Sequence, residues 1–371
     1  MNILAYIGKK VLSIIKNLGI LVTVAVGIML IASAYCGHID PETNAKFAIA
    51  GLLFPVLLVI HAIILLVWLI ARRWLIALLA AAFLLACYPT LITFAPVNLS
   101  GTDIAPSDST FTLLSYNVMN FDDFENHEGE NRTLRYILDK DADFVIMQEA
   151  SAKIKMNKLE KIQSLMPQLC RKYPYREQRL RDVVILSKHP YVVDNEAITE
   201  RSRPYKKSAA YKVQVNGRTL HIIGVHLESI HLSNSDKANY IDITDINFDE
   251  QKMEDVKTGI LSKLATAFRT RAVQAKELRH YIDSIGNNII LCGDFNDTPS
   301  SFSYNTIMGN DMSDAYRDCA LGPTITFHDN RFYFRIDHIL YKGDFEAINI
   351  ERGNMKSSDH YPLFATFRWK H

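Results

Sequence analysis

The sequence has few cysteines, and they are not arranged to cross-link a fold. Its five cysteines in 371 residues are Cys36, Cys87, Cys170, Cys292 and Cys319. An odd number without close spacing indicates neither a disulfide framework nor a zinc site. Cysteine therefore says little about the compartment, and the chain also lacks internal repeats and low-complexity tracts.

Charge is scarce in the first hundred residues, and basic residues are not in excess in the rest. Residues 1–100 contain six Lys or Arg and two Asp or Glu. Subtracting these from the chain totals of 41 and 40 leaves 35 and 38, so residues 101–371 carry a formal charge of −3. Nucleic-acid binders usually have a basic excess, because contacts to phosphates supply most of their affinity. Such a partner is therefore less expected, although a local basic groove stays compatible with this balance.

The first hundred residues do have three long apolar runs. Residues 17–36, 47–70 and 74–94 each reach the roughly 20 residues that a helix needs to cross a bilayer. The first run is too long for the apolar core of a signal peptide, and two more follow it. Buried helices of a soluble domain rarely run this long without charge. We therefore predict an anchor of three transmembrane helices in residues 1–95 and, from its composition, a linker at 96–109.

The positive charges around these runs predict their orientation. Before the first run and between the second and third stand Lys9, Lys10, Lys16, Arg72 and Arg73. The loop between the first two runs carries Asp40 and Glu42, with Lys46 at its far end. Because positive loops stay cytoplasmic, we predict a multi-pass membrane protein with a cytoplasmic N-terminus. Everything after the third run then lies outside the cytoplasm, in the periplasm if the organism is a didermic bacterium.

From residue 110 onward, short β-like runs alternate with helical patterns. Strands are predicted at 111–118, 144–148, 183–187, 211–215, 218–225, 289–292, 335–341, 345–350 and 363–369. Helices are predicted at 132–138, 153–165 and 253–285. Asn216-Gly217 is a strong hairpin signal, and the polar stretch 228–251 indicates an insertion or flexible loop. This mixture predicts an α/β (α+β) four-layer sandwich, in which two mixed β-sheets pack together and helices flank them.

Polar residues stand at the ends of six predicted strands. They are Asn117, Glu149, His226, Asp294 with Asn296, Asp337, and Asp359 with His360. The stretch 291–301 is the most informative, because a buried run delivers Asp294 and Asn296 to a strand end before Pro299 breaks the strand. A carboxylate can take a proton from water and an amide can hold an oxygen, so this pair suits a phosphate site. By itself, the tetrapeptide Gly-Asp-Phe-Asn could also be a plain turn.

Together these motifs resemble the endonuclease/exonuclease/phosphatase superfamily, which includes pancreatic deoxyribonuclease, abasic-site endonucleases, sphingomyelinases and inositol polyphosphate 5-phosphatases. The matching pieces are Ser115-Tyr116-Asn117-Val118, Gln148-Glu149, Val225-His226-Leu227, Gly293-Asp294-Phe295-Asn296, Ile336-Asp337-His338-Ile339 and Ser358-Asp359-His360. They occur in the family's order and span about residues 111–371, outside the apolar runs. The resemblance implies a catalytic domain at 110–371 that hydrolyses phosphoesters with Mg²⁺ as cofactor, and Mn²⁺ is the alternative ion.

The resemblance also implies a metal site. Mg²⁺ is a hard ion that prefers oxygen ligands and keeps several waters, so one or two carboxylates suffice. Glu149 is expected to be the metal ligand, as its family counterpart is. Asn117 resembles the amide that flanks the metal and the phosphate, and its plainer interpretation is a hydrogen-bonded turn. Asp359 resembles the family's carboxylate near the metal.

The remaining implied roles are catalytic. Asp294 would orient or deprotonate the attacking water, and Asn296 would hold a non-bridging phosphate oxygen. Asp337 would hold His360 and keep it charged, so that the imidazole stabilises the phosphoryl charge or protonates the leaving oxygen. His226 would supply a second cationic or hydrogen-bonding group across the phosphate, its plainer interpretation being a core histidine.

Several neighbouring residues are given other interpretations. Arg181-Asp182 precedes a strand where family members often place substrate-contacting side chains, so Arg181 is a candidate for substrate binding. Asp297 is expected to cap the following helix, and His338 to be structural. A basic face on the predicted helix 253–285 is expected to be solvated, with contact to lipid head groups as the alternative. It comprises Arg269, Arg271, Lys276 and Arg279.

Three functions follow from these predictions. The first is a membrane-anchored, extracytoplasmic Mg²⁺-dependent phosphodiesterase or phosphatase that acts on a phosphoester close to the bilayer, such as a lipid head group or a small organic phosphate. The second is a nuclease for DNA or RNA outside the cytoplasm, and the third is a non-catalytic binding module on the same fold. The bilayer and the phosphoester are the expected partners, and no obligate protein partner is inferred.

Overall fold

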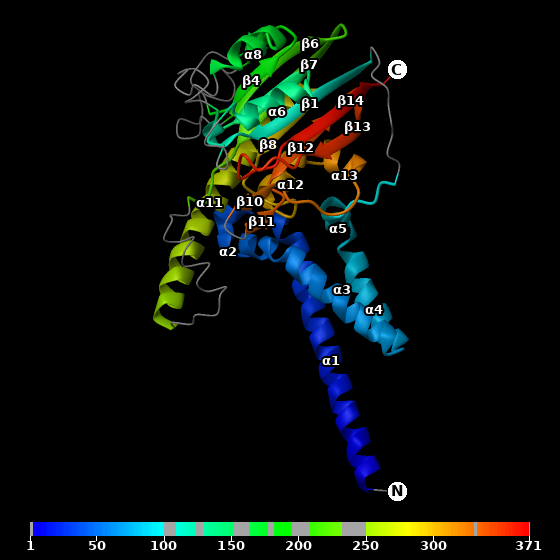
Figure 1. The fold of residues 1–371 in the computed structure, drawn as a ribbon. Helices are drawn as coiled ribbons and strands as arrows, with labels where there is room; N and C mark the ends of the chain where they lie inside the picture. Colours follow the sequence, from blue (N-terminus) through cyan, green and yellow to red (C-terminus); the bar gives the residue numbers. More distant parts are fainter. Residues whose placement is uncertain are drawn as a thin grey trace.

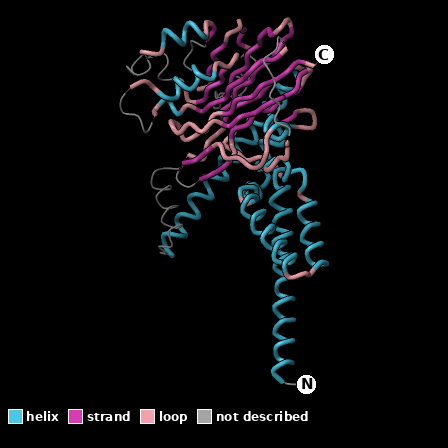
Figure 2. The backbone as a smooth tube through the Cα atoms, turned by 45° about the vertical axis from the view of Figure 1, so that its right-hand side comes forward, coloured by secondary structure: helices cyan, strands magenta, loops and turns pink. Residues whose placement is uncertain are grey.

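The structure is a computed structural model in which a layered domain stands on a group of N-terminal helices (Figures 1 and 2). It describes residues 3–99, 109–123, 129–150, 163–176, 182–194, 208–231, 250–329 and 332–370. The predicted helix 153–165 and the insertion 228–251 fall mostly outside these residues, as does Arg181.

The layered domain contains two six-stranded mixed sheets. In order across the first sheet lie β13 (Phe345–Arg352), β14 (Leu363–Trp369), β1 (Thr110–Asn117), β2 (Phe144–Gln148), β4 (Val184–Ser187) and β3 (Tyr175–Arg176). In the second lie β5 (Tyr191–Val193), β6 (Ser208–Val215), β7 (Arg218–His226), β8 (Ile289–Asp294), β12 (Asp337–Lys342) and β9 (Ser313–Asp314). A separate hairpin pairs β10 (Phe327–Asp329) with β11 (Phe332–Phe334). Only β1–β2 and β7–β8 are parallel among these described pairs.

Apolar side chains between and outside the sheets form three cores. The central core, which includes Phe111, Ile146 and Ile222, lies between the two sheets. A second core packs α6 (Arg132–Lys140) and α8 (Met166–Lys172) on the first sheet, and a third packs α11 (Glu250–Ile285) and α12 (Phe302–Met308) on the second. The short helices η2 (Met119–Phe121) and α13 (Ala315–Cys319) lie in the connections. The predicted arrangement of two mixed sheets flanked by helices is confirmed.

Local sequence explains where several of these elements begin and turn. Asn131 caps α6, because its side chain accepts a hydrogen bond from the backbone N–H of Leu134. The β6–β7 hairpin turns at Asn216 and Gly217, whose φ angles of 53° and 77° are both positive. A two-residue turn of this kind requires such angles at both central positions, so the hairpin signal in the sequence is confirmed.

The N-terminal helices differ from three uninterrupted spans. They are α1 (Ile3–Tyr35), η1 (Cys36–His38), α2 (Pro41–Leu52), α3 (Phe54–Ile70), α4 (Trp74–Ala86) and α5 (Tyr88–Phe94). By length and apolarity, one described helix could cross a membrane, or up to three spans if each bent pair counts as one. The pair α2–α3 bends by 46° and the pair α4–α5 by 71°. Each break is followed by a proline, Pro55 or Pro89, which lacks the N–H that would continue the preceding helix. Three transmembrane helices therefore stay a prediction.

The predicted linker begins packed against the layered domain. Val97 forms an isolated bridge with Leu321, and the Asn98 side chain donates hydrogen bonds to the carbonyls of Arg317 and Ala320. Residues 100–108 lie outside the described part of the chain. The helical unit and the layered domain are thus in contact well before the chain enters β1.

Candidate active site

The polar strand ends come together because of how the strands pair. At the end of the parallel pair β1–β2, Asn117 lies opposite Gln148. At the end of the parallel pair β7–β8, His226 lies opposite Asp294. Since β12 runs antiparallel to β8, its first residue, Asp337, also lies opposite Asp294. The strand ends of both sheets therefore deliver polar side chains to one edge of the sandwich.

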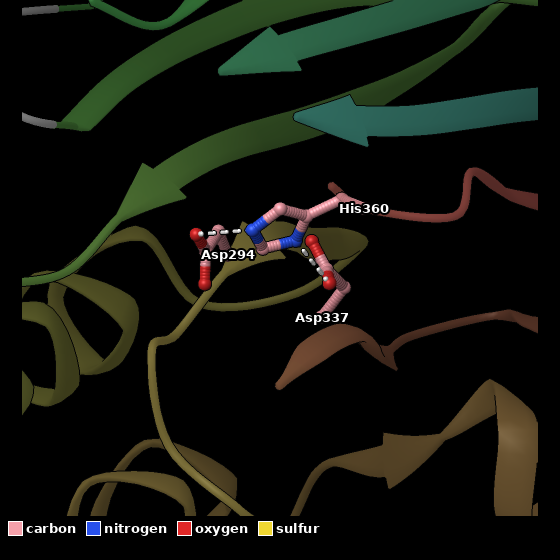
Figure 3. Close-up of side chains that lie close together, drawn as sticks. All are labelled: Asp294, Asp337 and His360. Atoms are coloured by element: carbon pink, nitrogen blue, oxygen red, sulfur yellow. Dashed lines mark hydrogen bonds and ion pairs between the residues drawn. The ribbon is translucent and has the colours of Figure 1, made fainter. Parts of the chain in front are cut away.

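His360 lies between two carboxylates at this edge (Figure 3). Its Nδ1 is 2.8 Å from Oδ2 of Asp337, and its Nε2 is 3.6 Å from Oδ2 of Asp294. All three side chains are almost completely buried. Burial alone would lower the pKa of the imidazole, but the charge of Asp337, and after it that of Asp294, raises the pKa from 6.5 to about 10. His360 is therefore a cation at neutral pH, held in one orientation by Asp337.

Two asparagine side chains fix the carboxylate of Asp294. Nδ2 of Asn117 donates to Oδ2 of Asp294 at 3.1 Å and to Oε1 of Glu149 at 3.2 Å. Asn296 donates from its backbone N–H to Oδ1 of Asp294 at 2.7 Å and from Nδ2 to Oδ2 at 3.2 Å. Asn296 has a φ of 51°, a left-handed conformation that asparagine tolerates better than most residues. The carboxylate is thus pre-oriented by three donor contacts.

A second histidine–aspartate pair lies on the other side of Asp294. Nδ1 of His226 is 2.5 Å from Oδ2 of Asp182, while Nε2 of His226 is 3.7 Å from Asp294 and 3.8 Å from Glu149. Asp182 therefore orients His226 as Asp337 orients His360. The sequence drew attention to Arg181-Asp182 for substrate contact, but it contained no signal for this pairing.

Glu149 is the acidic residue at this edge that best fits a hydrated cation. Its side chain is 31% exposed, whereas those of Asp294 and Asp337 are 2% and 3% exposed. An ion that keeps several of its waters needs a carboxylate that is open on one side. Glu149 also has a φ of 56°, and uncommon backbone conformations of this kind cluster at functional sites.

A different trio also has the spacing of metal ligands. One ligand atom from each of Asp294, Asp337 and His360 lies within 4.8 Å of the others. A histidine must lose its proton to bind a metal, and the raised pKa of His360 opposes this loss. The trio therefore suits proton and charge chemistry when no metal is bound, and the role of Glu149 as metal ligand stays a prediction.

The structure leaves two predicted roles open. Asp359 immediately precedes His360, and its Oδ1 accepts a hydrogen bond from Oγ of Ser358 at 3.3 Å. Its part in metal binding stays a prediction. The proposed substrate contact of Arg181 lies outside the described residues.

Two predictions near the site are wrong. Asp297 does not cap α12, because Ser301 does so by accepting from the backbone N–H of Tyr304. Asp297 is instead buried and pairs with Nε of Arg271 at 3.1 Å. Arg271 is 1% exposed and so is not part of a solvated face.

The structure agrees with the structural role predicted for His338. Its side chain is fully buried, with Nε2 2.9 Å from the Asp297 carbonyl, and burial lowers its pKa to about 3.

Two mixed sheets with flanking helices, and an edge that joins an open carboxylate to two histidine–aspartate pairs, define a metal-dependent phosphoester hydrolase. A family model described as "Endonuclease/Exonuclease/phosphatase family" matches residues 114–360, and the chain belongs to this family. A second model, "Domain of unknown function (DUF8431)", matches residues 13–94. No curated protein matches the chain.

Among solved structures, the chain is similar to a humanized TDP2 of D. rerio, with 16% identity, 70% of this chain and 99% of that one covered, and a TM-score of 0.46. It is also similar to the human Nocturnin catalytic domain, with 16% identity, 72% of this chain and 96% of that one covered, and a TM-score of 0.46. An endonuclease/exonuclease/phosphatase family protein from Bacteroides thetaiotaomicron is 14% identical, with coverage of 72% and 100% and a TM-score of 0.43.

Proposed function

We propose that the protein is a membrane-anchored, Mg²⁺-dependent hydrolase of phosphoesters whose catalytic domain lies outside the cytoplasm. The observation that carries the hydrolase is the position of Asp294, whose carboxylate lies within 3.7 Å of both His226 and His360. A carboxylate that can hold water, flanked by a cationic imidazole, is the arrangement that hydrolysis at phosphorus requires.

Each residue has a task that follows from its surroundings. Asp294, held by its amide donors, orients the attacking water and accepts its proton. His360 bears a proton on the nitrogen that faces Asp294, so it stabilises negative charge on the phosphoryl group or protonates the leaving oxygen. His226 contributes a second cationic or hydrogen-bonding group, and Asn296 a neutral donor. Because Asp337 and Asp182 fix the two rings in advance, little reorganisation is needed during the reaction.

Glu149, with Asn117 beside it, would hold the Mg²⁺ ion. Bound there, the ion supplies a positive charge that polarises a phosphate oxygen. The hard oxygen ligand and the open position of the Glu149 side chain support Mg²⁺, and Mn²⁺ has the same ligand preference.

The first substrate that we propose is a phosphoester presented at the membrane surface. In support, Ser300 lies six residues after Asp294 and donates a hydrogen bond to the Gly51 carbonyl of the apolar helical unit at 3.1 Å. A lipid head group or a small phosphate near the bilayer would thus be close to the site. The formal charge of −3 on residues 101–371 gives no general attraction for nucleic acid.

A substrate panel tests this proposal on the full-length protein in detergent or lipid discs with Mg²⁺. We expect release of phosphorylated head groups or of phosphate from small esters, with little nicking of plasmid DNA. Nicking as the main activity would replace this substrate class with the nuclease alternative. An Asp294→Ala variant as active as the parent would defeat both enzymatic proposals. The location of the catalytic domain can be tested with an alkaline phosphatase reporter fused after His371. Because this reporter folds only outside the cytoplasm, we expect the fusion to show reporter activity.

A further inference from the structure

The loop that follows Asp294 is held by two different parts of the chain. Within the catalytic domain, Asp297 pairs with Arg271 of α11, and its carbonyl contacts Nε2 of His338 at 2.9 Å. The other side of the loop faces the N-terminal helical unit. Residues 295–301, which follow Asp294 at the end of β8, therefore form a loop between the sheet and the apolar helices, and we call it the catalytic loop.

The contacts from the helical unit are buried and close. Oγ of Ser300 donates to the Gly51 carbonyl at 3.1 Å, and Sγ of Cys36 lies 3.8 Å from the Ser300 carbonyl. Ser300 is 1% exposed. Gly37 allows the backbones to approach, because a Cβ atom there would lie 2.3 Å from the Ser300 carbonyl oxygen. A real Cβ never comes so near to backbone, so a side chain at position 37 must displace the loop or the helices.

The helical unit also packs on the helix that holds the catalytic loop. Ala48 of α2 lies in one buried apolar cluster with Leu264 and Phe268 of α11. At the other end of this contact, Nζ of Lys276 is 2.6 Å from the carboxylate of Asp40. The helix that supplies Arg271 to Asp297 is therefore itself fixed by α2.

A second contact leads to the other catalytic carboxylate. Arg335, two residues before Asp337, has a side chain that is 1% exposed. Its Nη1 donates to the Thr93 carbonyl in α5 at 2.8 Å, and its Nη2 pairs with Asp314 of the catalytic domain. The backbone segments that carry Asp294 and Asp337 thus each have a buried polar contact with the helical unit.

We propose that the N-terminal helical unit is a positioning part of the active site, which holds the catalytic loop through Ser300 and the segment before Asp337 through Arg335. A tether would need none of these buried contacts. Ser300, Gly37 and Arg335 are then positioning residues, whose loss lowers turnover without changing how substrate is bound. This proposal rests on the proposed function, because it takes Asp294 and Asp337 to be catalytic.

The test compares three glycine and serine variants of the full-length protein with bis(p-nitrophenyl) phosphate and Mg²⁺. Gly37→Ala inserts a Cβ against the Ser300 carbonyl, and we expect kcat to fall about tenfold or more, because displacements of about 1 Å cost up to about a hundredfold. Ser300→Ala removes the hydrogen bond to Gly51 without a clash, together with the 3.2 Å contact between Oγ of Ser300 and Oγ1 of Thr298, and we expect kcat to fall about three- to tenfold. KM should stay within about twofold of the parent in both.

Gly27→Ala is the matched control, because it inserts a Cβ into α1 at 2.5 Å from the Phe83 ring, within the helical unit and away from the catalytic loop. It should lower the melting temperature but keep the parental kcat. Parental kcat in folded Gly37→Ala and Ser300→Ala would overturn the proposal, as would an equal fall in Gly27→Ala. If Gly37→Ala does not fold, Ser300→Ala decides. An Asp294→Asn variant with full activity would instead refute the proposed function.

Discussion

The proton on His360 should set the alkaline limit of activity, and Asp337 should set the pH at which that limit lies. Burial opposes the protonated imidazole, yet the neighbouring carboxylates, Asp337 first, raise its pKa from 6.5 to about 10. The parent enzyme should therefore stay active through mild alkaline pH and lose activity only as the pH rises through about 10. Asp337→Asn keeps the shape and a hydrogen-bonding group but removes the charge, so the alkaline limit should move to lower pH.

The size of the effect follows from the two pKa values. With a pKa of about 10, about 99% of the imidazole is protonated at pH 8, whereas at its ordinary value of 6.5 about 3% is. After the substitution, Asp294 still raises the pKa and burial still lowers it, so 6.5 is a suitable reference. At pH 6, about three quarters of the imidazole would remain protonated in Asp337→Asn. The substitution should therefore lower kcat about 25-fold more at pH 8 than at pH 6.

Steady-state rates between about pH 5.5 and 9.5 at saturating Mg²⁺ measure this profile. Asp283→Asn is the matched control, because Asp283 is 60% exposed and pairs with Arg279 on the outer helix. It should leave the profile unchanged. A fall in kcat by the same factor at every pH in Asp337→Asn would refute the reasoning, since Asp337 would then orient the ring without controlling its charge.

Three further substitutions test other parts of the site. Glu149→Gln should raise the Mg²⁺ concentration for half-maximal activity about tenfold or more, and an unchanged titration curve would move the metal elsewhere. Asp182→Asn should lower kcat about tenfold with KM within about twofold, because His226 loses the carboxylate that orients it; parental kcat would remove Asp182 from the mechanism. Arg271→Met should lower the free energy of unfolding by about 3–5 kcal/mol in denaturant titrations, because Asp297 is left buried without its partner. Adding Asp297→Leu should recover most of that loss, and a loss below about 1 kcal/mol in the single variant would contradict the prediction.

The sequence could predict that the site residues gather, because the ends of strands can be recognised in the sequence and strand pairing brings those ends together. Asp294, Asn117 and His226 each follow a run of apolar residues, so each had to stand where a buried strand reaches the surface. In the parallel pairs β1–β2 and β7–β8, such ends lie side by side. The local pattern therefore identified most of the site residues, whereas the distances between their side chains depend on the fold.

What the sequence could not predict depends on partners far along the chain. Asp182 meets His226 only because β4 and β7 belong to facing sheets, and no spacing in the sequence marks that pair. Asp297 had the pattern of a helix cap, but Ser301 lies in the capping position and Arg271 takes the carboxylate. Arg271 could not be predicted to be buried, because helical periodicity does not show that Asp297, a buried carboxylate, lies on the facing loop. Tertiary pairing overrode the local preference in each case.

Composition also could not tell a membrane span from an apolar helix that packs on protein. Without their bent partners, α3 has 17 residues and α4 has 13, or about 26 and 20 Å of helix, against a hydrocarbon core of about 30 Å. The hairpin of α3 and α4 is therefore compatible with three arrangements: crossing a thinned bilayer, entering it and returning, or packing on protein without entering it. In each of them the hairpin begins and ends on the same side, so the side on which the chain would leave a membrane depends on α1 alone.

The contacts along α1 support a cytoplasmic position for its N-terminal end. Trp68, near the end of α3, donates from Nε1 to Oγ1 of Thr23 at 2.8 Å, and its ring lies against Gly19. The turn with Arg72 and Arg73 is therefore level with the start of the apolar part of α1, just after Lys16. Positive charges from two separate segments share one plane, as the cytoplasmic boundary of an anchor requires. This arrangement supports the proposed location of the catalytic domain outside the cytoplasm, whether the unit crosses the bilayer once or three times.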